Sequence, residues 1–433
     1  MRMHPRHSIA IGFLLVLLST TLVGAQDRVA IRCGQLIDGR SSAPRTDVVI
    51  VVEGEKIVEV REGPNVPDGM RFIDYGNGSC LPGLIDLHAH ILINPTGGVH
   101  NDLGRSSADR ALDGLRNAQT MLRAGFTTLR DPGDFDAYYA GVSIKRAIAA
   151  GEFVGPRLFI APHAIGPTGG HGDVNDLSPD LSLQVPTRTA DGPDELRKAI
   201  REEVKYGADW IKLMATGGVM SAGDNPNHTA YTDAEFHAAV DETHRLGRKI
   251  TVHAIGTAGI KAAVRAGVDA VEHGILIDEE GIALMKERGT WLVPTLYVLN
   301  YVVEEGPRLG YAEESVEKAR ALLDVRDANI RRAFEAGVKI AFGSDTIFPH
   351  EQATREFAHL VRLGMSPMRA IQTATVNAAQ VLGVEREIGA VAPGMYADII
   401  AVDGDPLDDI TELEDVDFVM HGGQVIKDER PRT

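Results

Sequence analysis

The fold class and the first candidate site are both indicated by one segment, Leu84-Ile85-Asp86-Leu87-His88-Ala89-His90. A short apolar segment runs directly into two histidines that are separated by one residue. In an extended strand, residues i and i+2 point to the same face, whereas on a helix the same two side chains would diverge. We therefore interpret residues 84–88 as a buried strand whose end carries two histidines able to bind one cation together.

Seven further segments of this kind follow along the chain, and helical patterns separate most of them. The expected strands cover residues 84–88, 127–130, 157–161, 210–214, 249–253, 270–273, 291–295 and 339–344. Glycine follows several of the helical patterns, as at Gly207, Gly247 and Gly337, which is typical of helix ends. Eight strands that alternate with helices predict a (β/α)8 barrel. No G-x-G-x-x-G sequence follows the first strand to favour a doubly wound sheet.

Both ends of the chain carry short β-type segments punctuated by glycine and proline. We expect residues 26–80 and 386–433 to form the two parts of one small β-sandwich domain. Residues 81–385 would then form the barrel, so the predicted fold class is α/β. The two cysteines, Cys33 and Cys80, either form a disulfide or remain two separate buried thiols.

Residues 1–25 have the pattern of a cleavable signal peptide. Arg2 and Arg6 precede an apolar run over residues 9–18, and Val23 and Ala25 occupy A-x-A-like cleavage positions. The run is shorter than the about 20 apolar residues that a membrane span needs. The sequence therefore predicts a secreted or periplasmic protein without membrane association after signal removal. An uncleaved membrane anchor is the alternative.

The charge balance excludes some partners. Lys and Arg number 44 against 61 Asp and Glu in 433 residues, which gives a formal net charge of −17. Nucleic-acid binding needs a surplus of basic residues, and so does attraction to anionic lipid. We therefore expect no nucleic-acid partner.

Further potential metal ligands fall at or near the ends of other expected strands. Each has an ordinary explanation by itself: a hydrogen-bonded core histidine, an ion-paired lysine, or an aspartate that caps a helix. In a (β/α)8 barrel, however, the carboxyl ends of the strands build the active site. Their coincidence at this face predicts a metal site formed by His88, His90, Lys212, His253, His273 and Asp345.

These motifs together resemble the amidohydrolase superfamily. The resemblance covers nearly the whole chain after residue 25, and it is carried by residues 81–90, 168–173, 211–212, 252–254, 272–274, 343–345 and 393–398. It is greatest to the binuclear branch with imidazolonepropionase-like enzymes, Xaa-Pro dipeptidases and ochratoxin-hydrolysing amidohydrolases.

The resemblance implies two divalent metal ions, with zinc expected from the histidine-rich ligand set. His88, His90 and Asp345 would hold one ion, and His253 and His273 the other. Lys212 would be carboxylated and bridge both. A hydroxide bridging the metals would attack the amide carbonyl, and Asp345 would pass its proton to the leaving nitrogen.

The resemblance also implies contacts with the substrate. We expect Tyr231 and His163 to assist catalysis and to bind the substrate, and His171 and His228 to bind it. Relatives are often oligomeric, which implies a homo-oligomer.

The implied activity is hydrolysis of an amide or peptide bond in a small substrate with a free carboxylate. Xaa-Pro or hydrophobic dipeptides, N-acyl amino acids and ochratoxin-like amides fit this description. Three alternatives remain open at this point. They are a hydrolase of lactones, cyclic imides or phosphotriesters, a mononuclear deaminase or imidazolonase, and a non-catalytic scaffold.

Overall fold

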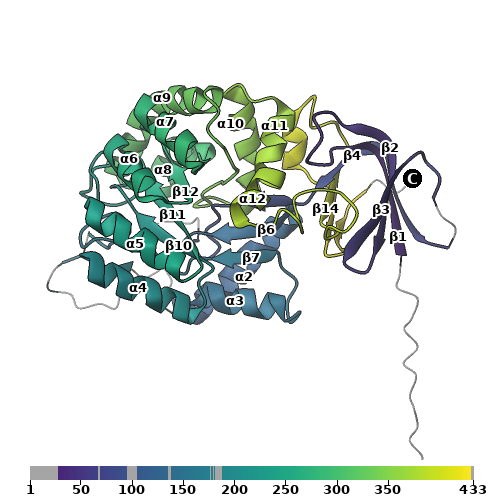
Figure 1. Cartoon of the computed structure of the whole chain (residues 1–433). Helices are drawn as coiled ribbons and strands as arrows, with labels where there is room; N and C mark the ends of the chain where they lie inside the picture. The colour runs from purple at the N-terminus through teal and green to yellow at the C-terminus, as the bar shows by residue number, and fades with distance from the viewer. Residues whose placement is uncertain are drawn as a thin grey trace, which may run out of the picture.

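The computed structural model describes residues 28–430, apart from residues 67–68, 95–104, 135–137, 176, 179 and 181–187. The predicted signal peptide lies outside the described residues. A larger α/β body and a smaller β unit lie side by side (Figure 1). Strands from both ends of the chain, drawn in purple and yellow, meet in the β unit.

Parallel strands form the centre of the α/β body, as the apolar segments predicted. One sheet has the order β5-β6-β7, with β5 (Leu84–Asp86), β6 (Phe126–Asp131) and β7 (Arg157–Ile160). A second sheet has the order β13-β12-β11-β10-β8-β9. Its strands are β8 (Ala164–Gly166), β9 (Arg188–Thr189), β10 (Trp210–Met214), β11 (Lys249–Ala254), β12 (Ala270–His273) and β13 (Trp291–Val293). Both faces of a parallel sheet must be covered by other parts of the protein, and the residues of β10 and nearly all of those of β11 are buried accordingly.

Among the described residues, hydrogen bonds do not join these two sheets into one closed eight-stranded barrel. The expected eighth strand makes only an isolated bridge, between Leu292 and Ile340. Backbone hydrogen bonds still link the same segment to both neighbours, because Ala341 N donates to Leu292 O at 3.0 Å and Leu87 N to Phe342 O at 3.1 Å. The parallel α/β body is therefore confirmed, whereas the closed barrel is not.

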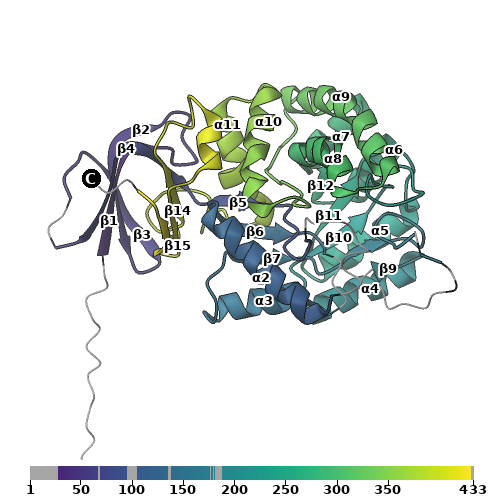
Figure 2. The same ribbon diagram turned by 180° about the vertical axis from the view of Figure 1, so that it is seen from behind.

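Helices surround the strands on the outside, as Figures 1 and 2 show from opposite sides. They are α2 (Ser107–Arg123), α3 (Ala140–Ala149), α4 (Pro193–Tyr206), α5 (Asp233–Arg245), α6 (Thr257–Ala266), α7 (Glu279–Arg288), α8 (Leu296–Leu309), α9 (Glu313–Glu335), α10 (Glu356–Arg362), α11 (Pro367–Gln372), α12 (Ala378–Leu382) and the short turns η1 (His350–Arg355), η2 (Thr373–Asn377) and η3 (Ile410–Glu414). Gly207 ends α4 at φ +116°, a conformation that glycine adopts readily. No helix of the described part is both long and apolar enough to cross a membrane.

The β unit is one seven-stranded sheet with the order β16-β15-β14-β4-β1-β2-β3. Its strands are β1 (Arg28–Leu36), β2 (Arg45–Glu53), β3 (Lys56–Glu62), β4 (Arg71–Pro82), β14 (Ile399–Val402), β15 (Phe418–His421) and β16 (Gln424–Asp428). The sheet curls back on itself, because Ile57 N donates to Met395 O at 3.0 Å and Ala397 N to Glu55 O at 2.8 Å. Both chain ends thus build one unit as expected, but a sandwich of two sheets is not confirmed.

A disulfide between Cys33 and Cys80 joins β1 to β4 inside this sheet. Both cysteines are fully buried. Of the two states that the sequence left open, the paired one is therefore found.

Candidate metal centre

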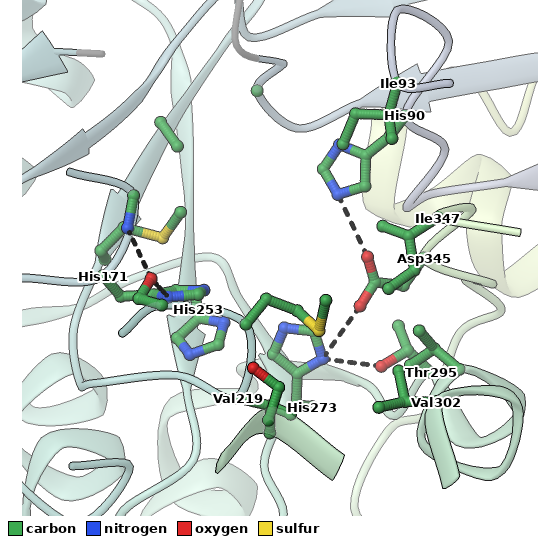
Figure 3. Close-up of a pocket in the computed structure, with 18 of the residues that line it drawn as sticks. His90, Ile93, His171, Val219, His253, His273, Thr295, Val302, Asp345 and Ile347 are labelled. Atoms are coloured by element: carbon green, nitrogen blue, oxygen red, sulfur yellow. Dashed lines mark hydrogen bonds and ion pairs between the residues drawn. The ribbon is translucent and has the colours of Figure 1, made fainter. Parts of the chain in front are cut away.

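The carboxyl ends of the parallel strands surround a cavity of about 300 Å³. All of the predicted metal ligands line it, namely His88, His90, Lys212, His253, His273 and Asp345. In the close-up of Figure 3, His90, His273 and Asp345 face one another across the cavity, with His253 and His171 on the opposite side. Residues that are up to 257 positions apart in the sequence are thus brought together.

The donor atoms have the spacing of ligands that share a cation. His90 Nε2 lies 3.1 Å from Asp345 Oδ1, and His88 Nε2 lies 3.2 Å from His90 Nε2 and 3.6 Å from Asp345 Oδ1. Two ligands about 2.1 Å from one tetrahedral zinc ion lie roughly 3.4 Å apart. His273 joins the same group, because one ligand atom each from His88, His273 and Asp345 lie within 4.8 Å of one another.

Two buried carboxylates orient the first pair of histidines. Glu272 Oε2 lies 2.8 Å from His88 Nδ1, and Asp134 Oδ1 lies 3.1 Å from His90 Nδ1. When Nδ1 donates to a carboxylate, the lone pair of Nε2 is left for a metal. Glu272 is itself held by Arg130 and by the Thr251 hydroxyl. The roles of Glu272 and Asp134 are not predicted by the sequence, because no local pattern shows which carboxylate meets which histidine ring.

Left-handed backbone turns aim several of these side chains. His273, Thr295 and Asp345 have φ of +69°, +45° and +60°, which non-glycine residues rarely adopt. At His273 the turn breaks the alternation of β12, so that both Glu272 and His273 reach the site. Such strain persists only where the surrounding structure imposes it, and it is common at functional sites. The Thr295 hydroxyl lies 2.7 Å from His273 Nδ1 and fixes that ring.

Burial keeps most of the histidines neutral, which metal binding requires. It lowers the pKa of His88 and His253 well below the usual value and that of His273 to about 4. His90 differs, because its hydrogen bonds to Asp134 and Asp345 outweigh burial and raise its pKa to about 10. His90 would therefore release a proton when it binds a cation.

Asp345 is ionised. Burial alone would raise the pKa of its carboxyl group, but the nearby rings of His88, His90 and His273 outweigh burial and hold that pKa below the usual range. A carboxylate at this position supplies negative charge among histidine donors, which carry none once they bind a metal.

Lys212 is the unusual member of the group. Its side chain lies within β10, and the residue is only 3% exposed. Burial lowers the pKa of its amine to about 8, although the carboxylates of Glu272 and Asp345 act in the opposite direction. Within the described part of the chain, no hydrogen bond or ion pair holds its Nζ atom. A buried lysine without a partner is costly as an ammonium, so this position favours a neutral or modified amine.

The predicted substrate contacts divide into two groups. His171 lines the cavity, its ring lies 4.2 Å from that of His253, and its Nδ1 lies 2.6 Å from Ser221 Oγ. The other three do not line the cavity. His163 Nδ1 lies 3.0 Å from Glu203, the Tyr231 hydroxyl donates to Ala190 O at 3.2 Å, and His228 is exposed beside Asn225. This placement gives no support to the expected catalytic roles of His163 and Tyr231, or to substrate binding by His163, Tyr231 and His228.

The fold and the centre together define a class of protein: an α/β enzyme with a histidine-rich, metal-binding type of site at the carboxyl ends of parallel strands. Residues 80–426 match the amidohydrolase family, and the chain belongs to this family. It is a hydrolase that acts on C–N bonds.

Comparisons with individual proteins support this assignment. The chain is 35% identical over 373 residues to an ochratoxinase of Aspergillus niger, covering 80% of this chain and 75% of the relative. It is also similar to the crystal structure of a Xaa-Pro dipeptidase with bound methionine in its active site. That similarity has a TM-score of 0.87 and 35% identity, and it covers 92% of this chain and 99% of the other. The crystal structure of the A. niger ochratoxinase is similar with a TM-score of 0.82 and 31% identity, over 93% and 96% of the two chains.

Proposed function

We propose that this protein is a binuclear metal-dependent hydrolase that cleaves an amide or peptide bond in a small substrate carrying a free carboxylate. The convergence of six potential ligands on one cavity carries this proposal. Similarity to a Xaa-Pro dipeptidase and to an ochratoxinase supports an amide substrate. The candidate substrates are Xaa-Pro or hydrophobic dipeptides, N-acyl amino acids and ochratoxin-like amides.

The donor set fits two divalent cations, with zinc expected. His88, His90 and Asp345 would hold one, and His253 and His273 the other. Lys212 would bridge them after its neutral amine adds CO2, which forms an N–C bond and releases one proton. The lowered pKa of Lys212 supports this step, because it increases the fraction of nucleophilic amine near neutral pH.

When bound, the cations would activate a water molecule and polarise the amide carbonyl. The chain's own contribution is positioning and proton transfer. Asp345 would accept the proton of the attacking water at a carboxylate oxygen and pass it to the leaving nitrogen. His171 lines the same cavity beside His253, so that its ring is available to the substrate.

We propose that the strands of the α/β body form a (β/α)8 barrel and that the curled sheet acts as a β-sandwich domain. We also propose export to the periplasm or the outside through a cleaved segment at residues 1–25, and a homo-oligomer. The Cys33–Cys80 disulfide supports export, because such bonds persist in oxidising compartments.

A substrate panel tests the proposed function. Purified enzyme should release free amino acid from a Xaa-Pro dipeptide, an N-acetyl amino acid or ochratoxin A. Asp345→Asn should lower kcat/KM by at least about 100-fold, because it removes the proton carrier. Asp241→Asn on the exposed face of α5 is the matched control and should keep wild-type activity. Activity only on lactones, cyclic imides, phosphotriesters or deaminase substrates would overturn the proposal.

A further inference from the structure

The segment that carries Asp345 lies beside β5 without forming a β-ladder with it. Among the described residues, β5 pairs only with β6, and the isolated bridge of Ile340 is to Leu292. In a regular sheet, a ladder of backbone hydrogen bonds fixes the register of neighbouring strands. The donor atoms of His88, His90 and Asp345 nevertheless lie 3.1–3.6 Å apart where the two segments end. Contacts other than a ladder must therefore set this register.

A buried carboxylate joins the two segments just before the ligands. Asp86 is the last residue of β5 and is fully buried. Its Oδ1 atom accepts hydrogen bonds from the backbone amide of His88 at 2.8 Å and from that of Ser344 at 3.2 Å. Its Oδ2 atom accepts from the Ser344 hydroxyl. One side chain thus holds the backbone of a candidate ligand in one segment and the residue before Asp345 in the other.

Two more side chains join the same segments just beyond the ligands. The Thr346 hydroxyl accepts from His90 N at 2.9 Å, and His350 Nε2 donates to His90 O at 2.9 Å. Between these contacts and the carboxylate, Asp345 N donates to His88 O at 2.7 Å. Both Thr346 and His350 are buried. We call the side chains that join the two segments the clasp, and they are those of Asp86, Ser344, Thr346 and His350.

The polar groups of the clasp are costly to bury unless they are hydrogen-bonded. The hydrogen bonds of the Asp86 carboxylate all come from the two segments that it joins. A buried polar network that is satisfied in this way makes the local structure rigid and favours one arrangement of the chain. The clasp therefore fixes one relative position of the segment with His88 and His90 and the segment with Asp345.

We propose that Asp86 is a positioning residue, which acts through the clasp to hold His88, His90 and Asp345 at the spacing that one metal ion needs. This inference rests on the proposed function, because it assigns the clasp to the ion that these three residues would share. The ligands proposed for the other ion, His253 and His273, lie on β11 and β12, which a parallel ladder already joins. Loss of the clasp should therefore affect one ion and spare the other.

Zinc titration of the full chain against a competing zinc-binding dye tests this role without turnover. Asp86→Ala removes the carboxylate and should weaken one of the two zinc ions by at least about tenfold, because residues that orient metal ligands contribute this much to affinity. The affinity for the second ion should stay within about threefold of the wild type. Asp86→Asn keeps an acceptor oxygen for both backbone amides, so it should bind both ions within about threefold of the wild type.

Asp269→Ala is the matched control. Asp269 precedes β12 and accepts from Ile250 N at 2.9 Å, so it also joins two strands through a backbone amide, but at their amino ends. Its loss should leave both zinc affinities unchanged. If Asp86→Ala does not fold, Thr346→Val replaces it, because valine keeps the branched shape and removes the acceptor for His90 N. Thr346→Ser, which keeps the hydroxyl, then replaces Asp86→Asn.

The outcomes separate this inference from the proposed function. Wild-type zinc affinity in Asp86→Ala, or an equal loss for both ions, would overturn the role of the clasp and leave the binuclear hydrolase intact. A loss in Asp86→Asn as large as in Asp86→Ala would also overturn it, because the charge rather than the position would then matter. A single zinc ion in the wild type would refute the binuclear centre, and the clasp would stand if Asp86→Ala weakens that ion and Asp269→Ala does not. A wild type that binds no zinc would refute both.

Discussion

At the scale of single residues, the candidate metal ligands depend on the hydrogen bonds behind them. At His273 this support is a single hydroxyl group, that of Thr295, which lies 2.7 Å from Nδ1 of the ring. A histidine that is held at one nitrogen presents the other in a fixed direction, and loss of such a partner typically weakens metal binding by about 10–100-fold.

Thr295→Val should therefore lower zinc affinity about tenfold. Valine keeps the branched shape at this left-handed position but cannot hold the His273 ring. Thr295→Ser, which keeps the hydroxyl, is the control and should bind zinc almost as tightly as the wild type. Competition with a zinc-binding dye measures both affinities. Equal weakening in the two variants would show that packing, rather than the hydroxyl, matters at this position.

The sequence predicted that the candidate metal ligands gather at one site, and they line one cavity, whereas the residues that support them were not predicted. The spacing of His88 and His90 has a direct meaning on a strand, and the other ligands follow strand-like segments. Glu272 and Asp134 meet the histidines only through the tertiary fold, so no local pattern identifies them. The family resemblance implied that Tyr231 contacts the substrate, but its hydroxyl donates to Ala190 O instead, and no local pattern gives the direction of a loop side chain.

At the scale of elements, one aspartate joins the β unit to the α/β body. Asp398 precedes β14 and accepts from Arg157 of β7 at 2.9 Å and from His421 of β15 at 2.9 Å. Burial would raise the pKa of its carboxyl group, but these partners outweigh burial and lower it to about 2. These contacts give a structural role to Asp398, the last residue of the motif at residues 393–398.

Asp398→Asn should lower the free energy of unfolding by about 2 kcal/mol at pH 7. The folded-state pKa lies below the ordinary value, so the ionised carboxylate stabilises the fold above about pH 4. That stabilisation is lost as the pH falls through about 2, and the difference between the two proteins should shrink there. Urea unfolding at pH 7 and pH 3 measures this effect, with the exposed Asp408→Asn as control. A pH-independent difference would contradict the assignment.

The disulfide makes a second prediction at this scale. Cys33 and Cys80 are 47 residues apart, and their bond constrains the unfolded chain. The double variant Cys33→Ala, Cys80→Ala should lose about 2–4 kcal/mol of stability in urea unfolding. Reductant should destabilise the wild type and leave the variant unchanged. If reductant has no effect on the wild type, the cysteines are not paired in the purified protein.

The expected strands of the α/β body agree with the structure except for the eighth. Seven of the eight expected strands of the α/β body are present at nearly the expected residues. The segment at residues 339–344 has the right composition but does not form a full ladder. Phe342 N donates to Thr373 O in η2 at 3.0 Å rather than to a neighbouring strand. The local sequence does not show that the backbone N–H of Phe342 will donate to a residue far along the chain.

At the scale of the whole molecule, the β segments at both chain ends were expected to form one unit, and they share one sheet. The two parts join where β14 pairs with β4 in an antiparallel ladder, so neither of these strands is left with an open edge. The strands that carry the candidate ligands lie at the centre of the α/β body, and candidate ligands from different strands meet only when the whole body has folded. The candidate site is thus a property of the complete fold.

The binuclear centre is tested most directly by the metal content of the full chain, purified without chelator, together with a crystallographic examination of Lys212. We expect two divalent ions per chain and a carboxyl group on Lys212 Nζ that contacts both. One ion per chain with an unmodified Lys212 would contradict the binuclear centre and favour deaminase or imidazolonase chemistry on the same fold.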